Sequence, residues 1–255
     1  MPSTGSDRDI PRAQDQLFKA PGGARAKYAA LIVGRPGWTA LITYELIMAT
    51  QVLPGALGLA VRQLVYPWLL GSCGRNVVFG QGVTLRHPHK VHIGDNVVID
   101  DHCLLDAKGD DNQGIRIGSG VFVGRNTILS CKNGSITLDD GVNIGFNCEI
   151  FSAGVVTVGP NTLLAAYAYL IGGDHDFSDP TVAVNAQPRK AEGISVGEGV
   201  WIGAGAKVLD GVSIGNRAII GAGAVVLGSV PAGARAVGVP ARVLGARPEG
   251  SAGQA

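Results

Sequence analysis

An aliphatic residue recurs at every sixth position in the C-terminal part of the chain, and this spacing predicts the fold. Each aliphatic anchor is followed, four places later, by a second apolar residue of small or medium size. Neither the 3.6-residue period of a helix nor the two-residue period of an ordinary strand reproduces a strict six. The anchors are Val196, Ile202, Val208, Ile214, Ile220 and Val226, and their partners are Val200, Ala206, Val212, Ala218, Ala224 and Val230.

A triangular coil accounts for this period. Each six-residue unit supplies one short strand with two inward side chains and one corner, where Gly or Asn tolerates positive φ. Three units make a coil of about 18 residues, and parallel hydrogen bonds stack the coils about 4.8 Å apart. The pairs Ile93-Gly94, Ile117-Gly118 and Ile144-Gly145 continue the rhythm upstream. We therefore predict an all-β fold, a parallel β-helix over residues 77–243.

Other segments fall outside the repeat. Residues 172–193 carry Pro, Asp and Asn where a strand needs apolar side chains, so we predict a loop that leaves the helix. Residues 34–71 indicate a short helical segment, two helices broken at Pro54-Gly55, each with an apolar face. Residues 1–33 are predicted to be a disordered lead and residues 244–255 a flexible tail.

The apolar faces of residues 34–71 allow two interpretations. One is a cap over the first open coil, whose strand edges would otherwise be unpaired. In that case Leu57, Val61, Leu64 and Val65 form a face that shields the core. The other is a surface-lying membrane contact.

Composition narrows the classes of function. Charged residues make up 16% of the chain and the net charge is +1, so no nucleic-acid-binding face is predicted. The apolar stretch 38–53 is too short and too polar for a membrane span, and no signal peptide is recognised. The four cysteines form no CxxC pair, and Cys103 and Cys148 take small inward positions of the repeat. These features favour buried thiols and a cytoplasmic protein.

The stretch VGEGVWIGAGAKVLDGVSIGNRAIIGAGAVV, followed by AVGVPARV, resembles the C-terminal signature of the hexapeptide-repeat acyltransferases. The loop sequence GGDHD upstream belongs to the same pattern. Within that family the chain is most similar to the maltose- and galactoside-type O-acetyltransferases and their polysaccharide-modifying relatives. The resemblance implies a left-handed β-helix and a homotrimer with active sites in grooves between neighbouring helices. It also implies acetyl-CoA as the acyl donor.

His175 in the GGDHD loop matches the general base of that family. An imidazole with a pKa near 6.5 can accept the proton of a sugar hydroxyl at neutral pH. The thioester already has a thiolate leaving group with a pKa of about 8.5, so the reaction asks for one base and one oxyanion donor. The resemblance also assigns residues to the two ligands. For the cofactor these are Trp201, Gly203, Ala204, Gly221, Ala222 and Arg242, and for the acceptor they are Asn147 and Asp174.

The sequence departs from the family at two places. The Lys that often meets a CoA phosphate is missing from residues 227–229, so Arg235, Arg242 or Arg247 is expected to replace it. The Asn and Asp of the galactoside-type acceptor site correspond to Gly145 and Ala153. The acceptor therefore stays open.

A second cluster contains four histidines. His87 and His92 have the HxxxxH spacing of β-helical zinc carbonic anhydrases, but no His precedes them to complete the metal site. We therefore expect no metal, and expect His87, His89, His92 and His102 to be solvated residues on the coil surface.

These observations predict an acetyl-CoA-dependent O-acetyltransferase that modifies a hydroxyl of a sugar or glycan precursor by direct transfer in a ternary complex. N-acetylation of an amino sugar would need the same base and groove. A non-catalytic β-helix used as an assembly subunit would need neither His175 nor Trp201. Peripheral contact with the inner face of a membrane is a further expectation for residues 34–71.

Overall fold

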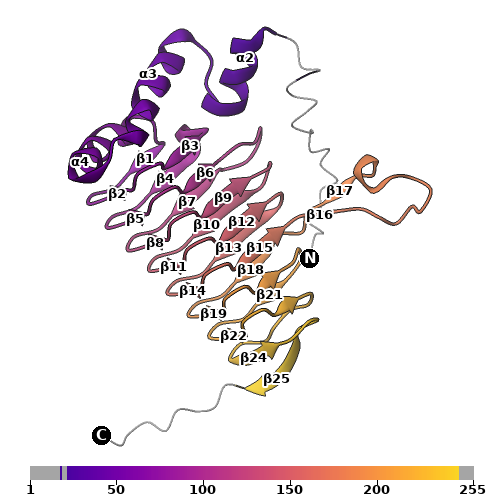
Figure 1. Ribbon diagram of the computed structural model, residues 1–255. Coiled ribbons are helices and arrows are strands. Elements are labelled where there is room, and N and C mark those ends of the chain that lie inside the picture. Colours follow the sequence, from indigo (N-terminus) through magenta and orange to yellow (C-terminus); the bar gives the residue numbers. More distant parts are fainter. Residues whose placement is uncertain (1–17, 19–21, 247–255) are drawn as a thin grey trace, which may run out of the picture.

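The computed structural model describes residues 18 and 22–246, and its main body is a parallel β-helix (Figure 1). Three sheets of seven, nine and seven strands form its faces, here called A, B and C. Successive strands along the chain belong to faces A, B and C in turn. Ser72 therefore pairs with His92, which lies one coil and 20 residues later. Every neighbouring pair in these sheets is parallel except the last, β24 with β25. The predicted parallel β-helix is confirmed, and the left-handed coil that the resemblance implies is consistent with this arrangement.

Each face consists of short strands in the order of the coils. Face A contains β1 (Ser72–Cys73), β4 (Val91–Ile93), β7 (Ile115–Ile117), β10 (Ser135–Leu138), β13 (Val155–Val158), β18 (Ile194–Val196) and β21 (Ser213–Ile214). Face B contains β2 (Val78–Phe79), β5 (Val98–Ile99), β8 (Phe122–Val123), β11 (Asn143–Ile144), β14 (Leu163–Leu164), β19 (Trp201–Ile202), β22 (Ile219–Ile220), β24 (Ala234–Val237) and β25 (Arg242–Ala246). Face C contains β3 (Thr84–Arg86), β6 (Leu104–Asp106), β9 (Ile128–Cys131), β12 (Glu149–Ser152), β15 (Tyr169–Gly172), β20 (Lys207–Val208) and β23 (Val225–Val226).

The core of the β-helix is lined by the positions that the six-residue period selects. All twelve anchors and partners between residues 196 and 230 are at most 4% exposed. Cys103 and Cys148 are each 1% exposed and fill the same kind of inward position. Burial raises the pKa of the Cys103 thiol to about 12, so this thiol stays protonated and unreactive.

Three edges run along the helix where the faces meet, and we call them the A–B, B–C and C–A edges. On the A–B edge, side-chain oxygens of one coil accept hydrogen bonds from corner N–H groups of the coil before it. Asp95 Oδ1 accepts from Arg75 N at 2.7 Å, and Asp140 Oδ1 accepts from Ser119 N at 2.7 Å. Asn96, with φ 58°, shows the left-handed corner conformation expected for the repeat. The backbone N–H groups of these corners therefore find their hydrogen-bond acceptors within the edge itself.

The N-terminal helices cover the open end of the first coil (Figure 1). Buried apolar side chains such as Ile47 and Leu69 join the core cluster, and polar tips of long side chains donate hydrogen bonds to carbonyls of this coil. Tyr44 Oη donates to Leu85 O at 2.7 Å, and Arg62 Nε donates to Phe79 O at 3.0 Å. The helical elements are α2 (Ala24–Tyr28), the π-helix Ala29–Val33, α3 (Trp38–Met48), the 3₁₀ turn Ala49–Val52, α4 (Gly55–Val65) and the 3₁₀ turn Tyr66–Trp68.

The side of α4 that packs on the β-helix differs from the one that the sequence suggested. Leu57 and Leu64 are 73% and 71% exposed, whereas Arg62 is 1% and Tyr66 0% exposed. The expectation that leucines of α4 shield the core is therefore wrong, because hydrogen bonds to the first coil decide which side turns inward. None of the helices described between residues 22 and 246 has both the length and the apolar character that a membrane crossing needs.

The helical region begins earlier than the sequence suggested. Ala24–Tyr28 and Ala29–Val33 are helical, within the range expected to be a disordered lead. The rest of that lead, residues 1–17 and 19–21, lies outside the described residues, as does the tail beyond residue 246. Strand β25 runs into the range expected to be tail, because it pairs with β24.

Candidate active site

The chain leaves the β-helix after β15, at the C–A edge, and returns at β18. Within this excursion β16 (Asp174–His175) pairs antiparallel with β17 (Arg189–Lys190), and a 3₁₀ turn spans Val184–Ala186. The excursion projects from the helix body in Figure 1, so the predicted loop is present. Lys190 Nζ lies 3.1 Å from Asp176 Oδ2. Hydrogen bonds from Ser178 and this ion pair lower the pKa of Asp176 to about 2, and they help to fix the base of the loop.

His175 lies at the base of this loop and faces Arg189 across the two-stranded ladder. Its side chain is half-buried, and its Nδ1 atom is buried without a hydrogen-bond partner in the described part of the chain. Asp174 is exposed, and its Oδ1 accepts a hydrogen bond from the backbone N–H of His175 at 2.7 Å. Asp174 thus shapes the backbone beside the imidazole rather than bonding to its ring.

The residues assigned to the cofactor gather elsewhere, around the B–C edge of the last coils. Trp201 lies on face B with its side chain 50% exposed. Gly203 and Gly221 stack in adjacent corners, and Gly203 N donates to Ile220 O at 2.8 Å. A Cβ on Gly203 would lie 2.5 Å from Ala222 N, so the stacking itself requires glycine here. The neighbouring corner residues, Ala204 and Ala222, are exposed and leave a strip of accessible backbone.

The two remaining assigned residues lie apart from His175. Arg242 is exposed on β25, opposite Val237. Asn147 occupies a corner of the B–C edge with φ 55°, and its backbone N donates to Arg125 O at 2.9 Å. Within one chain, face C therefore separates Asn147 from His175. These residues and His175 therefore do not lie on the same edge of one chain.

The outer side of face C between these edges is only partly accessible to water. Glu149 and Tyr169 pair on adjacent strands and are both half-buried. Burial raises the pKa of the Glu149 carboxyl and of the Tyr169 phenol. The outer side of face A also carries half-buried polar side chains, such as Thr137 and Thr157.

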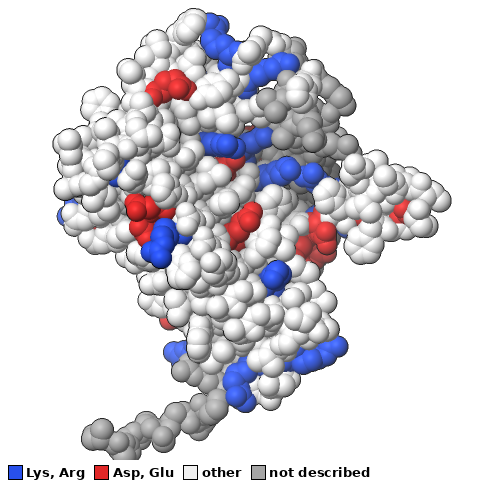
Figure 2. Space-filling model, viewed as in Figure 1, with Lys and Arg blue, Asp and Glu red and all other residues white. Residues whose placement is uncertain are grey.

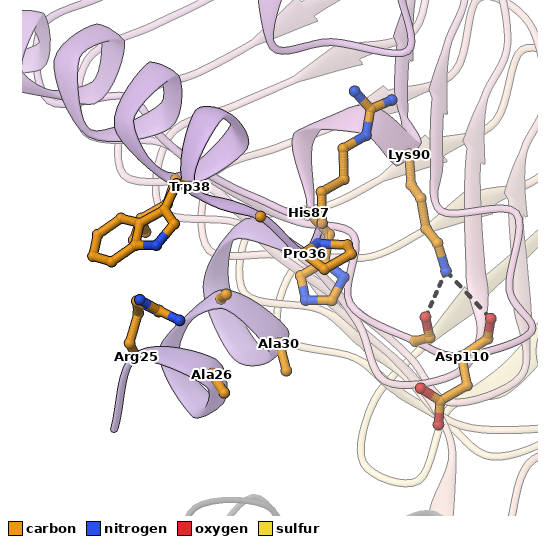
Figure 3. Close-up of a pocket in the computed structure, with 14 residues that line it drawn as sticks. Arg25, Ala26, Ala30, Pro36, Trp38, His87, Lys90 and Asp110 are labelled. Carbon is orange, nitrogen blue, oxygen red and sulfur yellow. Dashed lines mark hydrogen bonds between the residues drawn. The ribbon is translucent and has the colours of Figure 1, made fainter. Parts of the chain in front are cut away.

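A cavity of about 620 Å³ lies at the N-terminal end of the C–A edge (Figure 3). Its walls combine apolar surface with cationic side chains. Arg25 lies over the Trp38 ring at 4.1 Å, and Lys90 Nζ donates to Asn112 Oδ1 at 3.0 Å beside the insertion 107–114. The residues drawn and labelled around it are Arg25, Ala26, Ala30, Pro36, Trp38, His87, Lys90 and Asp110.

The structure corrects the expectation for the histidine cluster. His87 lines this cavity and is only 7% exposed, and its Nε2 atom has no hydrogen-bond partner among the described residues. Burial lowers its pKa, and burial, Arg35 and His87 lower the pKa of His89 to about 4. These two histidines are not solvated surface residues, because the N-terminal helices cover them. Within residues 22–246, no group of three His, Cys, Asp or Glu side chains is arranged to hold a metal ion.

Sequence reasoning missed three cationic residues on the C–A edge, namely Lys108, Lys132 and Arg189. The phase of the repeat breaks at this edge, in the insertion 107–114 and in the long loop, and those breaks were the available signal. The charges lie in different coils and far apart in sequence, so their proximity appears only in the fold.

The fold and repeat define a parallel β-helix of hexapeptide units, and comparison with known proteins agrees. Residues 193–228 match the family model described as bacterial transferase hexapeptide (six repeats). The recognition of this repeat is therefore confirmed. The match covers the most regular coils, which follow directly on the His175 loop.

Two similar proteins carry the name of an acetyltransferase. The chain is 30% identical over 108 residues to the candidate colanic acid biosynthesis acetyltransferase WcaF of Escherichia coli, covering 37% of this chain and 59% of WcaF. It is 32% identical over 130 residues to the candidate acetyltransferase Rv3034c of Mycobacterium tuberculosis, covering 51% of this chain and 43% of that protein. The chain thus spans about half the length of these relatives.

Among solved structures, a variant of the N-acyltransferase AntD from Bacillus cereus is similar to this chain. It contains dTDP-4-amino-4,6-dideoxyglucose and coenzyme A. The two chains are 25% identical with a TM-score of 0.50, and the match covers 71% of this chain and 86% of AntD.

Proposed function

We propose that this protein is an acetyl-CoA-dependent O-acetyltransferase that acts on a hydroxyl of a sugar or glycan precursor. The observation that carries the proposal is His175, a half-buried imidazole on the loop that leaves the β-helix directly before the matched repeats. The names of WcaF and Rv3034c, both acetyltransferases, support the class of reaction.

The proposed reaction is a direct transfer within a ternary complex. His175 takes the proton of the acceptor hydroxyl as its oxygen attacks the thioester carbonyl carbon. The C–S bond then breaks, and the CoA thiolate takes the proton from the imidazolium. The His175 ring forms no hydrogen bond with another described residue, so no partner in this part of the chain competes with the acceptor for it.

We further propose that acetyl-CoA lies along the B–C edge, with Trp201 beside the pantetheine arm and the exposed Ala204 and Ala222 against its amides. Gly203 and Gly221 keep the corners narrow there, and Arg242 is the proposed contact for a CoA phosphate. Asp174 and Asn147 are the proposed acceptor contacts. No metal takes part in this scheme.

We also propose a homotrimer, and the placement of these groups supports a site shared between chains. His175 and the B–C edge border opposite sides of face C, so a groove between two chains brings one set against the other. The partly buried outer side of face C suits such a contact. Mixing His175→Ala with a variant that blocks the cofactor strip, Ala222→Trp, should restore part of the activity if each site uses two chains.

N-acetylation of an amino sugar is the second candidate, and the AntD complex with an amino sugar nucleotide favours it. The test for both is CoA thiol release from acetyl-CoA with hydroxyl and amino sugars offered separately. Treating the product with hydroxylamine distinguishes them, because an ester is cleaved and an amide is not. Absence of thiol release with every sugar class would leave the non-catalytic assembly subunit. Peripheral membrane contact through the outer side of α3 and α4, in a cytoplasmic protein, remains a prediction.

A further inference from the structure

Three cations line the C–A edge next to the base of the His175 loop. Lys108 follows strand β6, Lys132 follows β9, and Arg189 lies on β17 opposite His175. All three side chains are half-buried. None of them forms an ion pair or a side-chain hydrogen bond with another described residue. In Figure 2, Lys and Arg side chains gather over the upper coils, above the base of the projecting loop.

The stacking of coils brings these residues to one edge. Asp110 N, in the insertion after Lys108, donates to Asn133 Oδ1, next to Lys132, at 3.1 Å. Lys132 N donates to Ser152 O at 2.7 Å, and Ser152 pairs with Gly172, where the loop begins. A continuous series of corners therefore connects the insertion 107–114 with the loop that carries Arg189.

Two other cations on this edge are paired with carboxylates. Arg86 NH1 lies 3.5 Å from Asp106 Oδ2, and Lys190 is paired with Asp176. The negative charges of Asp106 and Asp110 raise the pKa of Lys108 and so partly offset the lowering that burial causes. Unlike Arg86 and Lys190, Lys132 and Arg189 form no ion pair with a carboxylate among the described residues.

Lys132 shows the imbalance most clearly. Burial lowers the pKa of its ammonium group, and the charges of Arg189 and Lys108 lower it further. No carboxylate in the described part of the chain acts against this. Holding Lys132 close to two other cations costs free energy, and a bound anion would recover part of it.

The corner between Lys132 and the loop is occupied by a small residue. Ala153 is 9% exposed and packs under Gly173, where an added Cβ would lie 2.5 Å from the Ala153 Cβ. The corner at Ala153 itself therefore carries neither a bulky nor an acidic side chain, and of the acids at the loop base Asp176 is paired with Lys190.

We propose that Lys108, Lys132 and Arg189 bind a phosphate group of the acceptor, so that the substrate is a phosphate-linked sugar. This inference rests on the proposed acetyl transfer, since it takes His175 as the base beside the same ligand. A phosphate offers several charged oxygens to cations from different coils, whereas a carboxylate offers two oxygens and one charge. Nucleotide-linked and lipid-linked sugars share this group.

The direct test is calorimetric binding of inorganic pyrophosphate to the full chain, with CoA saturating so that the cofactor's own phosphate sites are occupied. Lys132→Gln should weaken binding at least tenfold, and Lys108→Gln combined with Lys132→Gln should weaken it further. Arg116→Gln, on the outer side of face A, removes one charge from an exposed position and should leave binding unchanged. Equal affinity in the wild type and Lys132→Gln would overturn the proposal.

Two further arms identify the source of the phosphate and separate this inference from the proposed function. UDP binding tighter than pyrophosphate supports a nucleotide-linked acceptor, and tighter binding of a short polyprenyl diphosphate supports a lipid-linked one. Glucuronate binding as tightly as pyrophosphate overturns the phosphate assignment. His175→Ala should keep pyrophosphate binding while losing turnover, and Lys132→Gln should raise KM for phosphate-linked acceptors more than it lowers kcat. Efficient transfer to neutral sugars, unaffected by Lys132→Gln, would overturn this inference and leave the acetyltransferase proposal intact.

Discussion

The A–B and C–A edges of the β-helix are built from the same repeat and differ in what they do with polar groups. On the A–B edge, acids such as Asp95 and Asp140 accept hydrogen bonds from neighbouring corners, and Asp95 also pairs with Arg75 at 2.9 Å. The C–A edge is interrupted by two insertions and carries cations and an imidazole without partners. An edge whose polar groups are hydrogen-bonded to one another supports the fold, whereas an edge with unpaired polar groups is available to a ligand.

Removing the imidazole from the C–A edge should give the largest effect. His175→Ala should lower kcat by about 10²–10⁴-fold, because a general base contributes on that scale. The melting temperature should stay unchanged, since Nδ1 makes no hydrogen bond that the variant would lose. Steady-state thiol release and thermal melting measure the two quantities. His102→Asn, at a B–C corner with φ 59°, is the matched control, and wild-type turnover in His175→Ala would contradict the assignment.

Acid should weaken the N-terminal end of the C–A edge. His87 and His89 have lowered pKa values, that of His89 about 4, so the folded protein binds fewer protons than the unfolded chain. The stability that this provides is complete above pH 6.5 and is lost as the pH falls from 6.5 towards 4. We expect the free energy of unfolding to fall by about 1–2 kcal/mol between pH 7 and pH 5. Urea titrations of the wild type and of His87→Gln with His89→Gln test this, and an equally steep loss in the double variant would contradict it.

A corner acid on the A–B edge should affect stability and not activity. Asp140→Ala removes the acceptor of the Ser119 N–H and should cost about 1 kcal/mol in the free energy of unfolding. Asp139, its neighbour, has no side-chain hydrogen bond with a described residue, so Asp139→Ala should cost less. Thermal melting and thiol release on both variants test the comparison. A loss of turnover in Asp140→Ala without a loss of stability would show that this edge also binds a ligand.

The outer side of α4, which belongs to neither edge, should give the smallest change in stability. Leu57→Gln with Leu64→Gln should change the free energy of unfolding by less than about 0.5 kcal/mol, because both side chains are already more than 70% exposed. Flotation with liposomes tests the predicted membrane contact on the same variant. Binding that is present in the wild type and lost in the variant supports the contact, and a wild type that does not bind contradicts it.

The regular part of the fold could be predicted because one period decides it. The twelve inward positions from Val196 to Val230 follow from apolar spacing alone, and Cys103 and Cys148 fall into the same pattern. The orientation of α4 could not be predicted in this way. A hydrophobic pattern counts apolar side chains, whereas Arg62 and Tyr66 are buried because the first coil offers carbonyls that need donors.

The candidate site was accessible to sequence reasoning only in part. The break in phase and the GGDHD motif led to His175, and the structure places this residue at the base of the loop. The spacing between Lys108, Lys132 and Arg189 follows no motif, because two insertions of different length separate them. The placement of Asn147 across face C from His175 likewise depends on which corner each residue occupies.

The coils stack at a constant distance, so each edge presents side chains at regular intervals along the helix axis. Residues that stack on one another in successive coils stand about 4.8 Å apart along the axis, as the pairing of Ser72 with His92 on face A illustrates. A charge that is moved by one repeat turn therefore shifts along the axis by one fixed step and keeps its direction. On such a scaffold the length of an acceptor can be matched in discrete increments, by choosing which coil carries the cation and leaving the base where it is.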